Sequence, residues 1–201
     1  MFDAMGTLLD LAPLERRIGS KAALDAWFER TLHSAASLTL SGGFAPFREI
    51  ARAALATTAA RLELRVDVEQ VMGGFGELEP FPDAAEAVAL ATNAAVLTNG
   101  GAEDTEKLLR RGGIEMRVIS VEEVRAYKPH PLPYRFAAEQ LGDRILLVSA
   151  HAWDVLGAQA AGFDAVWVDR GERVWPFPDG WSAPSASTLP EAVRTAFAHR
   201  S

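Results

Sequence analysis

The sequence predicts an α/β fold, in which a doubly wound parallel sheet carries an inserted bundle of helices. From residue 82 onward, short apolar runs rich in β-branched residues alternate with helical segments of about ten residues, as in βαβ units. From about residue 9 to residue 78, apolar residues recur at the three- and four-residue spacing of amphipathic helices, without a convincing strand. We therefore expect a core domain formed by residues 1–8 and 79–201, and a helical domain formed by residues 9–78.

The helical region divides into three segments. The first follows Ser20, whose hydroxyl suits an N-cap, and its apolar stripe consists of Leu24, Trp27, Phe28, Thr31, Leu32 and Ala35. After the break at residues 41–43, the second stripe consists of Phe47, Ile50, Ala51, Ala54 and Leu55. A shorter segment covers residues 68–72 and ends in two glycines. We interpret these stripes as the core of a helical bundle rather than as a cofactor site.

The second half of the chain alternates between helices and strands. We expect helices near residues 83–92, 103–111, 133–141 and 152–161, a last helix opened by Pro190, and strands near residues 94–97, 118–121, 145–148 and 165–168. In open parallel sheets the chemistry lies at the carboxyl ends of the strands. This rule directs attention to Asp3, Thr98 and Ser149 and to the residues that follow them.

The composition is that of an ordinary globular protein of 201 residues, with 49% hydrophobic and 23% charged residues. The formal charge of -7 argues against a nucleic-acid surface, because backbone phosphates are bound by clustered Lys and Arg. No apolar run reaches the roughly 18 residues of a membrane span, and the absence of cysteine excludes disulfides and thiol catalysis. We expect a small-molecule substrate, no nucleic-acid or membrane partner and a cytoplasmic location, and we leave a homodimer open.

Four segments bring chemically capable residues to predicted strand ends. Their residues are Asp3, Gly6 and Thr7 in the first, Thr98 and Asn99 in the second, Lys128 in the third, and Ser149, His151 and Asp154 in the fourth. Each has an ordinary explanation when taken alone: Lys128 as a solvated surface residue, His151 as a capping residue, Asp154 as an acid that favours a helix N-terminus. Because all of them fall at strand ends of one sheet, we predict that they form one active site.

In their order along the whole chain, these segments resemble the four motifs of the haloacid dehalogenase (HAD) superfamily. Residues 9–78 resemble the cap that this superfamily inserts between its first and second motifs, so the core would be a Rossmann-like HAD core. Phosphatases of the superfamily carry an acid/base Asp two residues after the nucleophile and an acidic metal ligand after the fourth strand. This chain has Met5 and Ala150 there. Because Mg²⁺ needs such oxygen ligands, we expect neither a metal nor another cofactor.

The motifs are most similar to those of the L-2-haloacid dehalogenases (type II), which work without a metal. The resemblance implies that Asp3 displaces halide from the α-carbon of the substrate, and that water then hydrolyses the resulting aspartyl ester. It also implies that Lys128 holds Asp3 anionic and that Asp154 orients Lys128 and the water. The implied substrate-binding residues are Thr7, Thr98, Asn99, Tyr134, Ser149, His151 and Phe28.

Three positions depart from the dehalogenase pattern. His151 stands where the dehalogenases have Asn, and Phe28 stands where they have a halide-binding Arg. Arg30 is close to Phe28 in sequence, but two residues correspond to about 200° around a helix, so Arg30 should point elsewhere. Only two residues precede Asp3, although a central strand usually has about five.

The sequence thus predicts a hydrolase with an aspartate nucleophile, most similar to enzymes that dehalogenate small 2-haloacids. Two alternatives stay open. One is a HAD hydrolase that acts on another small substrate, including a residual phosphatase that would need Mg²⁺. The other is a catalytically degenerate HAD-like binding protein, which the loss of the halide-binding Arg at Phe28 would favour.

Overall fold

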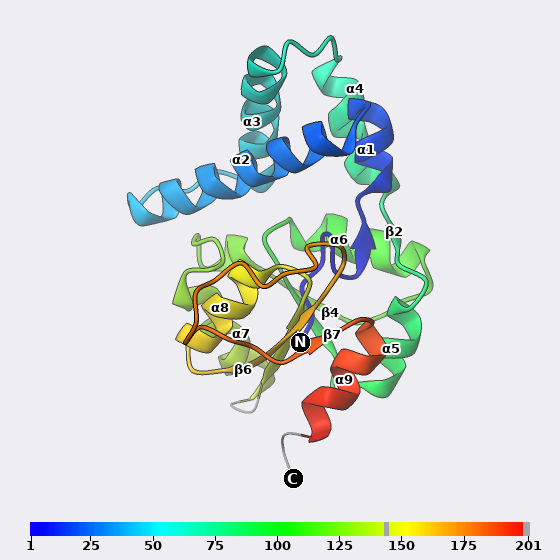
Figure 1. Ribbon diagram of the computed structural model, residues 1–201, viewed down its shortest axis with the longest axis vertical. Helices are drawn as coiled ribbons and strands as arrows, with labels where there is room; N and C mark the ends of the chain where they lie inside the picture. Colours follow the sequence, from blue (N-terminus) through cyan, green and yellow to red (C-terminus); the bar gives the residue numbers. More distant parts are fainter. Residues whose placement is uncertain (143–144, 199–201) are drawn as a thin grey trace.

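The computed structural model describes residues 1–142 and 145–198 of the chain. Residues 143, 144 and 199–201, which fall in the predicted core domain, lie outside the described residues. A parallel sheet with helices on both faces forms the lower part of the molecule, and a layer of helices lies above it (Figure 1). No helix in the described part of the chain is both long and apolar enough to cross a membrane.

The sheet is parallel, and the first residues of the chain lie at its centre. Its strands are β3 (Ala95–Thr98), β4 (Arg117–Ser120), β5 (Leu146–Ser149), β6 (Asp164–Val168) and β7 (Ser185–Ala186). Strand β3 pairs with β4, and β6 pairs with both β5 and β7. Phe2 bridges Val96 on β3 and Val148 on β5, which gives the order β4-β3-Phe2-β5-β6-β7.

The opening segment behaves as a central strand despite its shortness. The backbone nitrogen of Phe2 donates to Ala95 (2.8 Å), and its carbonyl accepts from Leu97 (2.9 Å). On the other side, the nitrogen of Asp3 donates to the carbonyl of Val148 (3.0 Å). Asp3 therefore stands at the carboxyl end of the middle strand, because hydrogen bonds on both sides hold the residues around it.

Alternation along the strands builds a core on each face of the sheet. Val96, Val148 and Val166 belong to one buried cluster, whereas their neighbours Leu97 and Leu147 belong to another. The first face is covered by α5 (Ala84–Leu90), α6 (Ala102–Arg111) and α9 (Leu189–Ala198), and the second by α7 (Pro131–Leu141) and α8 (Ala152–Ala160). These helices and strands β3 to β6 agree with the predicted elements to within a few residues at each end, whereas the two-residue strand β7 was not predicted.

The upper layer, which we call the cap, consists of helices. They are α1 (Ala12–Ile18), α2 (Lys21–Leu40), α3 (Phe47–Arg61), α4 (Val68–Gly73) and the 3-10 helix η1 (Gly74–Glu77); a second 3-10 helix, η2 (Val121–Glu123), lies in the core. The predicted N-cap is confirmed, since the hydroxyl of Ser20 accepts from the nitrogen of Ala23 at 3.1 Å. Helix α1 was not predicted from the sequence; it has Pro13 in its first turn and ends at Gly19, which has a φ of 91°.

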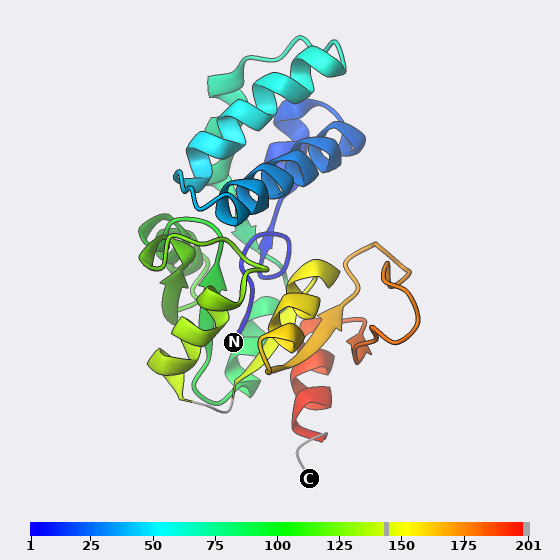
Figure 2. The same cartoon turned by 90° about the vertical axis from the view of Figure 1, so that its left-hand side faces the viewer.

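The expectation of no strand between residues 9 and 78 is wrong at one place. Strand β1 (Leu9–Asp10) pairs antiparallel with β2 (Glu79–Pro80), where the chain enters and leaves the cap (Figure 2). Two residues are too few to show the alternation that identifies a strand in a sequence. We propose that this pair marks the boundary between the core (residues 1–8 and 79–201) and the cap (residues 9–78).

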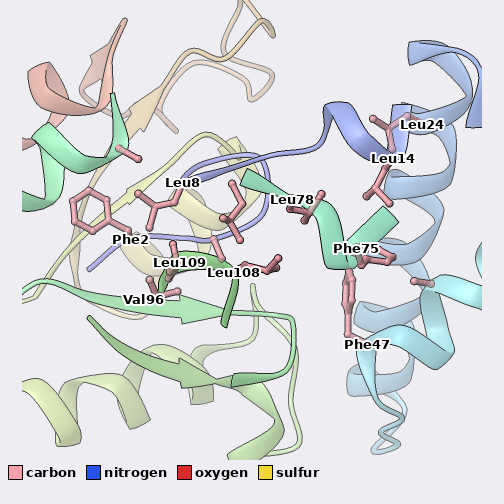
Figure 3. Close-up of a cluster of buried hydrophobic side chains, with 14 of the residues drawn as sticks. Phe2, Leu8, Leu14, Leu24, Phe47, Phe75, Leu78, Val96, Leu108 and Leu109 are labelled. Atoms are coloured by element: carbon pink, nitrogen blue, oxygen red, sulfur yellow. The ribbon is translucent and has the colours of Figure 1, made fainter. Parts of the chain in front are cut away.

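Apolar packing continues from the sheet into the cap. One buried cluster includes Phe2 and Leu8 beside the sheet and Phe47 and Phe75 in the cap, with the fully buried Leu78 in the connection (Figure 3). This continuity fixes the cap over the carboxyl ends of the strands, where the candidate site lies.

Candidate active site

Asp3 is buried at the point where the central strand gives way to a tight turn. Gly6 adopts the left-handed conformation, with φ of 77°, and donates its backbone N–H to the carbonyl of Leu9. The turn brings Thr7 back towards the strand end. Its hydroxyl donates to Oδ2 of Asp3 at 2.8 Å and accepts the backbone N–H of Ala150 at 2.9 Å. The hydroxyl of Thr7 thereby fixes Oδ2 of Asp3 in place.

Lys128 is buried to 98% and binds the other oxygen of Asp3. Its Nζ lies 2.8 Å from Oδ1 of Asp3, 2.8 Å from Oδ2 of Asp154 and 2.9 Å from the carbonyl oxygen of Leu97. An ammonium group has three N–H donors, so these three acceptors use all of them. Lys128 and Asp3, from the third and first motifs, thus form a buried ion pair.

Asp154 is held in place from its other side by Tyr134. The phenol hydroxyl donates to Oδ1 of Asp154 at 2.6 Å, and both residues are fully buried. Gly157 makes room for this contact, because a Cβ there would lie 2.6 Å from the hydroxyl oxygen of Tyr134. Tyr134 therefore orients Asp154, and Asp154 orients Lys128.

The pKa values of these groups follow from burial and from their mutual charges. Burial acts to raise the pKa of Asp3, but the Lys128 ammonium and the hydrogen bonds from Lys128 and Thr7 outweigh it and hold the pKa below its ordinary value of 3.8. Burial acts to lower the pKa of Lys128, yet the two carboxylates outweigh it and raise that pKa. Burial raises the pKa of Asp154, which shares one lysine with a second carboxylate. Asp3 is thus an anion at neutral pH.

The second motif contributes an amide with unused donors. The hydroxyl of Thr98 accepts the N–H of Gly100 at 2.9 Å, and Oδ1 of Asn99 accepts the N–H of Lys128 at 3.0 Å. The Nδ2 group of Asn99 is buried and has no hydrogen-bond partner in the protein. Because an unpaired buried donor is costly, this amide is suited to bind an acceptor group of a ligand.

A narrow cavity lies in front of Asp3, between the core and the cap. It is lined by Asp3, Met5, Phe28, Leu32, Phe47, Thr98, Asn99, Gly100, His151 and Trp153. Ser149 and Tyr134 are not among these residues: the hydroxyl of Ser149 accepts the N–H of His151 at 3.1 Å, and that of Tyr134 faces Asp154. Among the described residues that line it there is no Lys or Arg, and the Nδ2 group of Asn99 is the donor that lacks a partner in the protein.

His151 lies in a stack of three aromatic rings. The ring centroid of Phe28, from α2 of the cap, is 5.9 Å from that of the imidazole, and the centroid of Trp153 on α8 is 5.3 Å from it. Nε2 of His151 lies 2.7 Å from the carbonyl oxygen of Met5 and 3.6 Å from Oδ2 of Asp3. A carbonyl can only accept, so this contact requires a proton on Nε2. Arg30 lines a separate cavity of the cap, as the helical geometry predicts.

Several residues of the site were not assigned a role from the sequence. Trp153 lies within the fourth motif, and its ring is 5.9 Å from Nζ of Lys128, close enough for a cation–π contact. Arg170, which follows β6, donates to the carbonyl of Thr7 (3.3 Å) and to Oδ1 of Asp83 (2.7 Å). It thereby supports the turn after Asp3. Only its position after a strand end could have indicated this contact.

The site does not fit the Mg²⁺ ion of the phosphatase branch. The positions that would supply the further carboxylates are occupied by Met5, which lines the cavity, and by the buried Ala150. Among the described residues, no group of three or more His, Asp or Glu side chains is arranged to hold a metal ion.

The fold and this arrangement of strand ends define the protein as a hydrolase of the haloacid dehalogenase-like class. Residues 1–162 match the family of haloacid dehalogenase-like hydrolases, and the chain belongs to this family. It is 32% identical to (S)-2-haloacid dehalogenase 1 of Pseudomonas sp. (strain CBS-3), over 96% of this chain and 95% of that protein. It is also 32% identical to haloacetate dehalogenase H-2 of Moraxella sp. (strain B), over 84% of each chain.

Solved structures agree with this assignment. The L-2-haloacid dehalogenase from Xanthobacter autotrophicus superposes with a TM-score of 0.85 at 27% identity, over 98% of this chain and 96% of that chain. Its structure with chloropropionic acid covalently bound superposes with a TM-score of 0.84 over the same shares. The expected parallel α/β fold with a helical segment, and the expected membership of the L-2-haloacid dehalogenase family, are confirmed.

Proposed function

We propose that this protein hydrolyses the carbon–halogen bond of 2-haloacids through an ester with Asp3. The observation that carries the proposal is the state of the Asp3 carboxylate. Lys128 and Thr7 hold it anionic, with one hydrogen bond to each oxygen, at the wall of a small and mostly apolar cavity. An ionised carboxylate needs no general base to act as a nucleophile.

In the first step, an oxygen of Asp3 attacks the α-carbon of the substrate, and the halide leaves with the electrons of the broken bond. In the second step, water adds to the carbonyl carbon of the Asp3 ester. The bond from that carbon to the ester oxygen breaks, and the 2-hydroxy acid leaves with an oxygen that came from Asp3. One proton is released per turnover, and the carboxylate is regenerated with an oxygen from water.

The other residues of the site have supporting roles in this proposal. Lys128 keeps Asp3 ionised and aligned, and Asp154, oriented by Tyr134, aligns Lys128 and the water. The free amide N–H groups of Asn99 bind the carboxylate or the halide of the substrate. The narrow and mostly apolar cavity beside Asp3 suits a small organic acid rather than a large ligand.

The proposal is tested by measuring halide release from 2-chloropropionate and phosphate release from a small phosphomonoester side by side, with EDTA and with Mg²⁺. We expect halide release at the same rate in both conditions and no phosphate release, because Met5 and Ala150 provide no ligand oxygen for Mg²⁺. Phosphate release that EDTA stops and Mg²⁺ restores would instead indicate the phosphatase alternative. Release of neither product, from a protein that unfolds cooperatively, would indicate a binding protein.

The substitution Phe28→Arg tests the missing halide contact. Because Phe28 lines the cavity, an arginine there would face the departing halide, and we expect halide release from 2-chloropropionate to become about tenfold faster, equivalent to about 1.4 kcal/mol. Phe28→Leu, which keeps an apolar side chain, should not accelerate the reaction. An arginine at position 28 that leaves the rate unchanged in a folded protein would show that this position does not face the leaving group.

A further inference from the structure

A second and larger cavity adjoins the one in front of Asp3. It has a volume of about 310 Å³, and the first cavity is much narrower. The two share three wall residues, Met5, Phe47 and Gly100, so they lie next to each other. The second cavity extends away from Asp3, between α3 and η1 of the cap and α6 of the core.

The inner part of the second cavity is apolar. Phe47, Phe75 and Leu108 line it, each more than nine-tenths buried, and the two phenyl rings meet edge to face at 6.0 Å (Figure 3). These side chains come from both the cap and the core. An occupant that reaches them would exchange water for hydrocarbon contacts, which favours an apolar group.

The charged residues at the rim of the second cavity already have partners. Arg111 donates to the carbonyls of Gly76 and Leu78 at 2.7 Å, and Lys107 pairs with a glutamate one helical turn away. Arg48 pairs loosely with Asp104 across the cap and the core, at 3.7 Å. Because these side chains already have hydrogen-bond or ion-pair partners, the rim does not define a site for an anion, and the apolar interior determines the choice of ligand.

Met5 forms the partition between the two cavities. Its carbonyl is fixed by His151, but its side chain is unbranched and flexible. The methyl carbon Cε packs over Gly100 so closely that a Cβ on this glycine would lie 2.8 Å from it. Because Met5 lines both cavities, we expect rotation of its side chain to widen the connection between them.

We propose that the second cavity receives the substituent on the α-carbon, so that the preferred substrates are 2-haloacids with a straight apolar chain of several carbons. This inference rests on the proposed function for its reaction. The carboxylate and the α-carbon occupy the small cavity beside Asp3. The chain passes Met5 and lies against Phe75 and Leu108. Burial of one methylene contributes about 0.8 kcal/mol, so each added carbon should raise kcat/KM about three- to fourfold.

The experiment compares halide release from 2-chloropropionate, 2-chlorobutyrate and 2-chlorohexanoate. We expect kcat/KM of the wild-type protein to rise along the series. Gly76→Trp should reverse this preference, with at least a tenfold loss on 2-chlorohexanoate and less than a twofold change on 2-chloropropionate. Gly76 is exposed and lines the second cavity but not the first, and a Cβ there meets no atom within 4 Å, so a larger side chain can be added beside the second cavity without a clash.

Gly76→Ala serves as the matched control, because a methyl group does not fill the cavity and should leave the series unchanged. Met5→Ala should raise the preference for the longest acid by removing the partition. A wild-type protein that does not favour longer acids would overturn the proposal. So would a loss in Gly76→Trp that is equal on the shortest and the longest acid.

A binding measurement separates this inference from the proposed reaction. Calorimetric titration with propionate and hexanoate, which carry no halogen, needs no turnover. Suppose that no 2-haloacid releases halide, but hexanoate binds more tightly than propionate and Gly76→Trp removes the difference. The second cavity would then bind the carbon chain, and the proposed dehalogenase activity would be wrong. If halide is released but chain length affects neither binding nor kcat/KM, the proposed reaction would be supported, and the second cavity would not bind the carbon chain.

Discussion

Asp3→Asn will lower the rate of halide release from 2-chloropropionate by at least about 10³-fold, equivalent to roughly 4 kcal/mol in the barrier. The reason is that a neutral amide is a poor nucleophile, whereas the ionised carboxylate attacks without help from a base. The substitution keeps the size of the side chain, and its amide oxygen can still accept from Lys128. Folding should therefore be preserved, and the loss should appear in kcat.

The label of ¹⁸O-water identifies the nucleophile independently of the variant. In a single turnover by the wild-type protein, the hydroxyl oxygen of the product comes from Asp3 and should carry no label. Over many turnovers, the label should enter both Asp3 and the product. A mechanism in which Asp3 acts only as a base on water would deliver labelled oxygen in the first turnover.

Asp10→Asn provides the matched control, since it makes the same change seven residues later and outside the cavity. Oδ1 of Asp10 accepts the N–H of Ala12. Its rate should stay close to that of the wild type. More than a tenth of the wild-type rate in Asp3→Asn would rule out Asp3 as the nucleophile, provided that mass spectrometry shows no deamidation back to aspartate.

The residues that meet around Asp3 could be predicted because their position follows from local pattern. Thr98 and the residues after Val148 each end an apolar run, and the ends of parallel strands converge on one edge of a sheet. The role of Asp3 as a strand end was less evident, because only two residues precede it. Hydrogen bonds to β3 and β5 compensate for this shortness, and no local pattern reveals such long-range pairing.

The features that could not be predicted from the sequence depend on contacts between distant segments. The ring of Phe28 packs on His151 only because α2 of the cap lies over the carboxyl end of β5. Likewise, the second cavity exists because Phe75 and Leu108, from different parts of the chain, face a common space. A periodic stripe identifies the buried face of each helix, but it does not say which other element that face meets.

Lys128→Met should destabilise the protein by about 3–5 kcal/mol at pH 7, because the change leaves two buried carboxylates without a counter-ion. Methionine fills much of the volume of the lysine side chain, so the loss reports charge rather than a cavity. In the wild type, the lowered pKa of Asp3 contributes stability above the ordinary carboxyl pKa, and this stability is lost as the pH falls through the pKa of folded Asp3.

In Lys128→Met, the dependence of the free energy of unfolding on pH has the opposite sign. Without the ammonium, burial raises the pKa of both Asp3 and Asp154 above their values in the unfolded chain, so the folded state takes up protons more readily. The free energy of unfolding of the variant should therefore increase more from pH 7 to pH 5 than that of the wild type. Urea titrations at the two pH values measure the difference between the proteins, which should shrink on acidification.

Lys107→Met is the matched control for the loss of a lysine. Its ammonium lies at the surface and pairs with Glu103 on the same helix, a type of ion pair that contributes little. We expect a much smaller change in stability, with no dependence on pH over this range. If Lys128→Met were as stable as the wild type, or if its deficit were the same at pH 5 and pH 7, Lys128 would not be what keeps Asp3 ionised. The proposed activation of the nucleophile would then need another source.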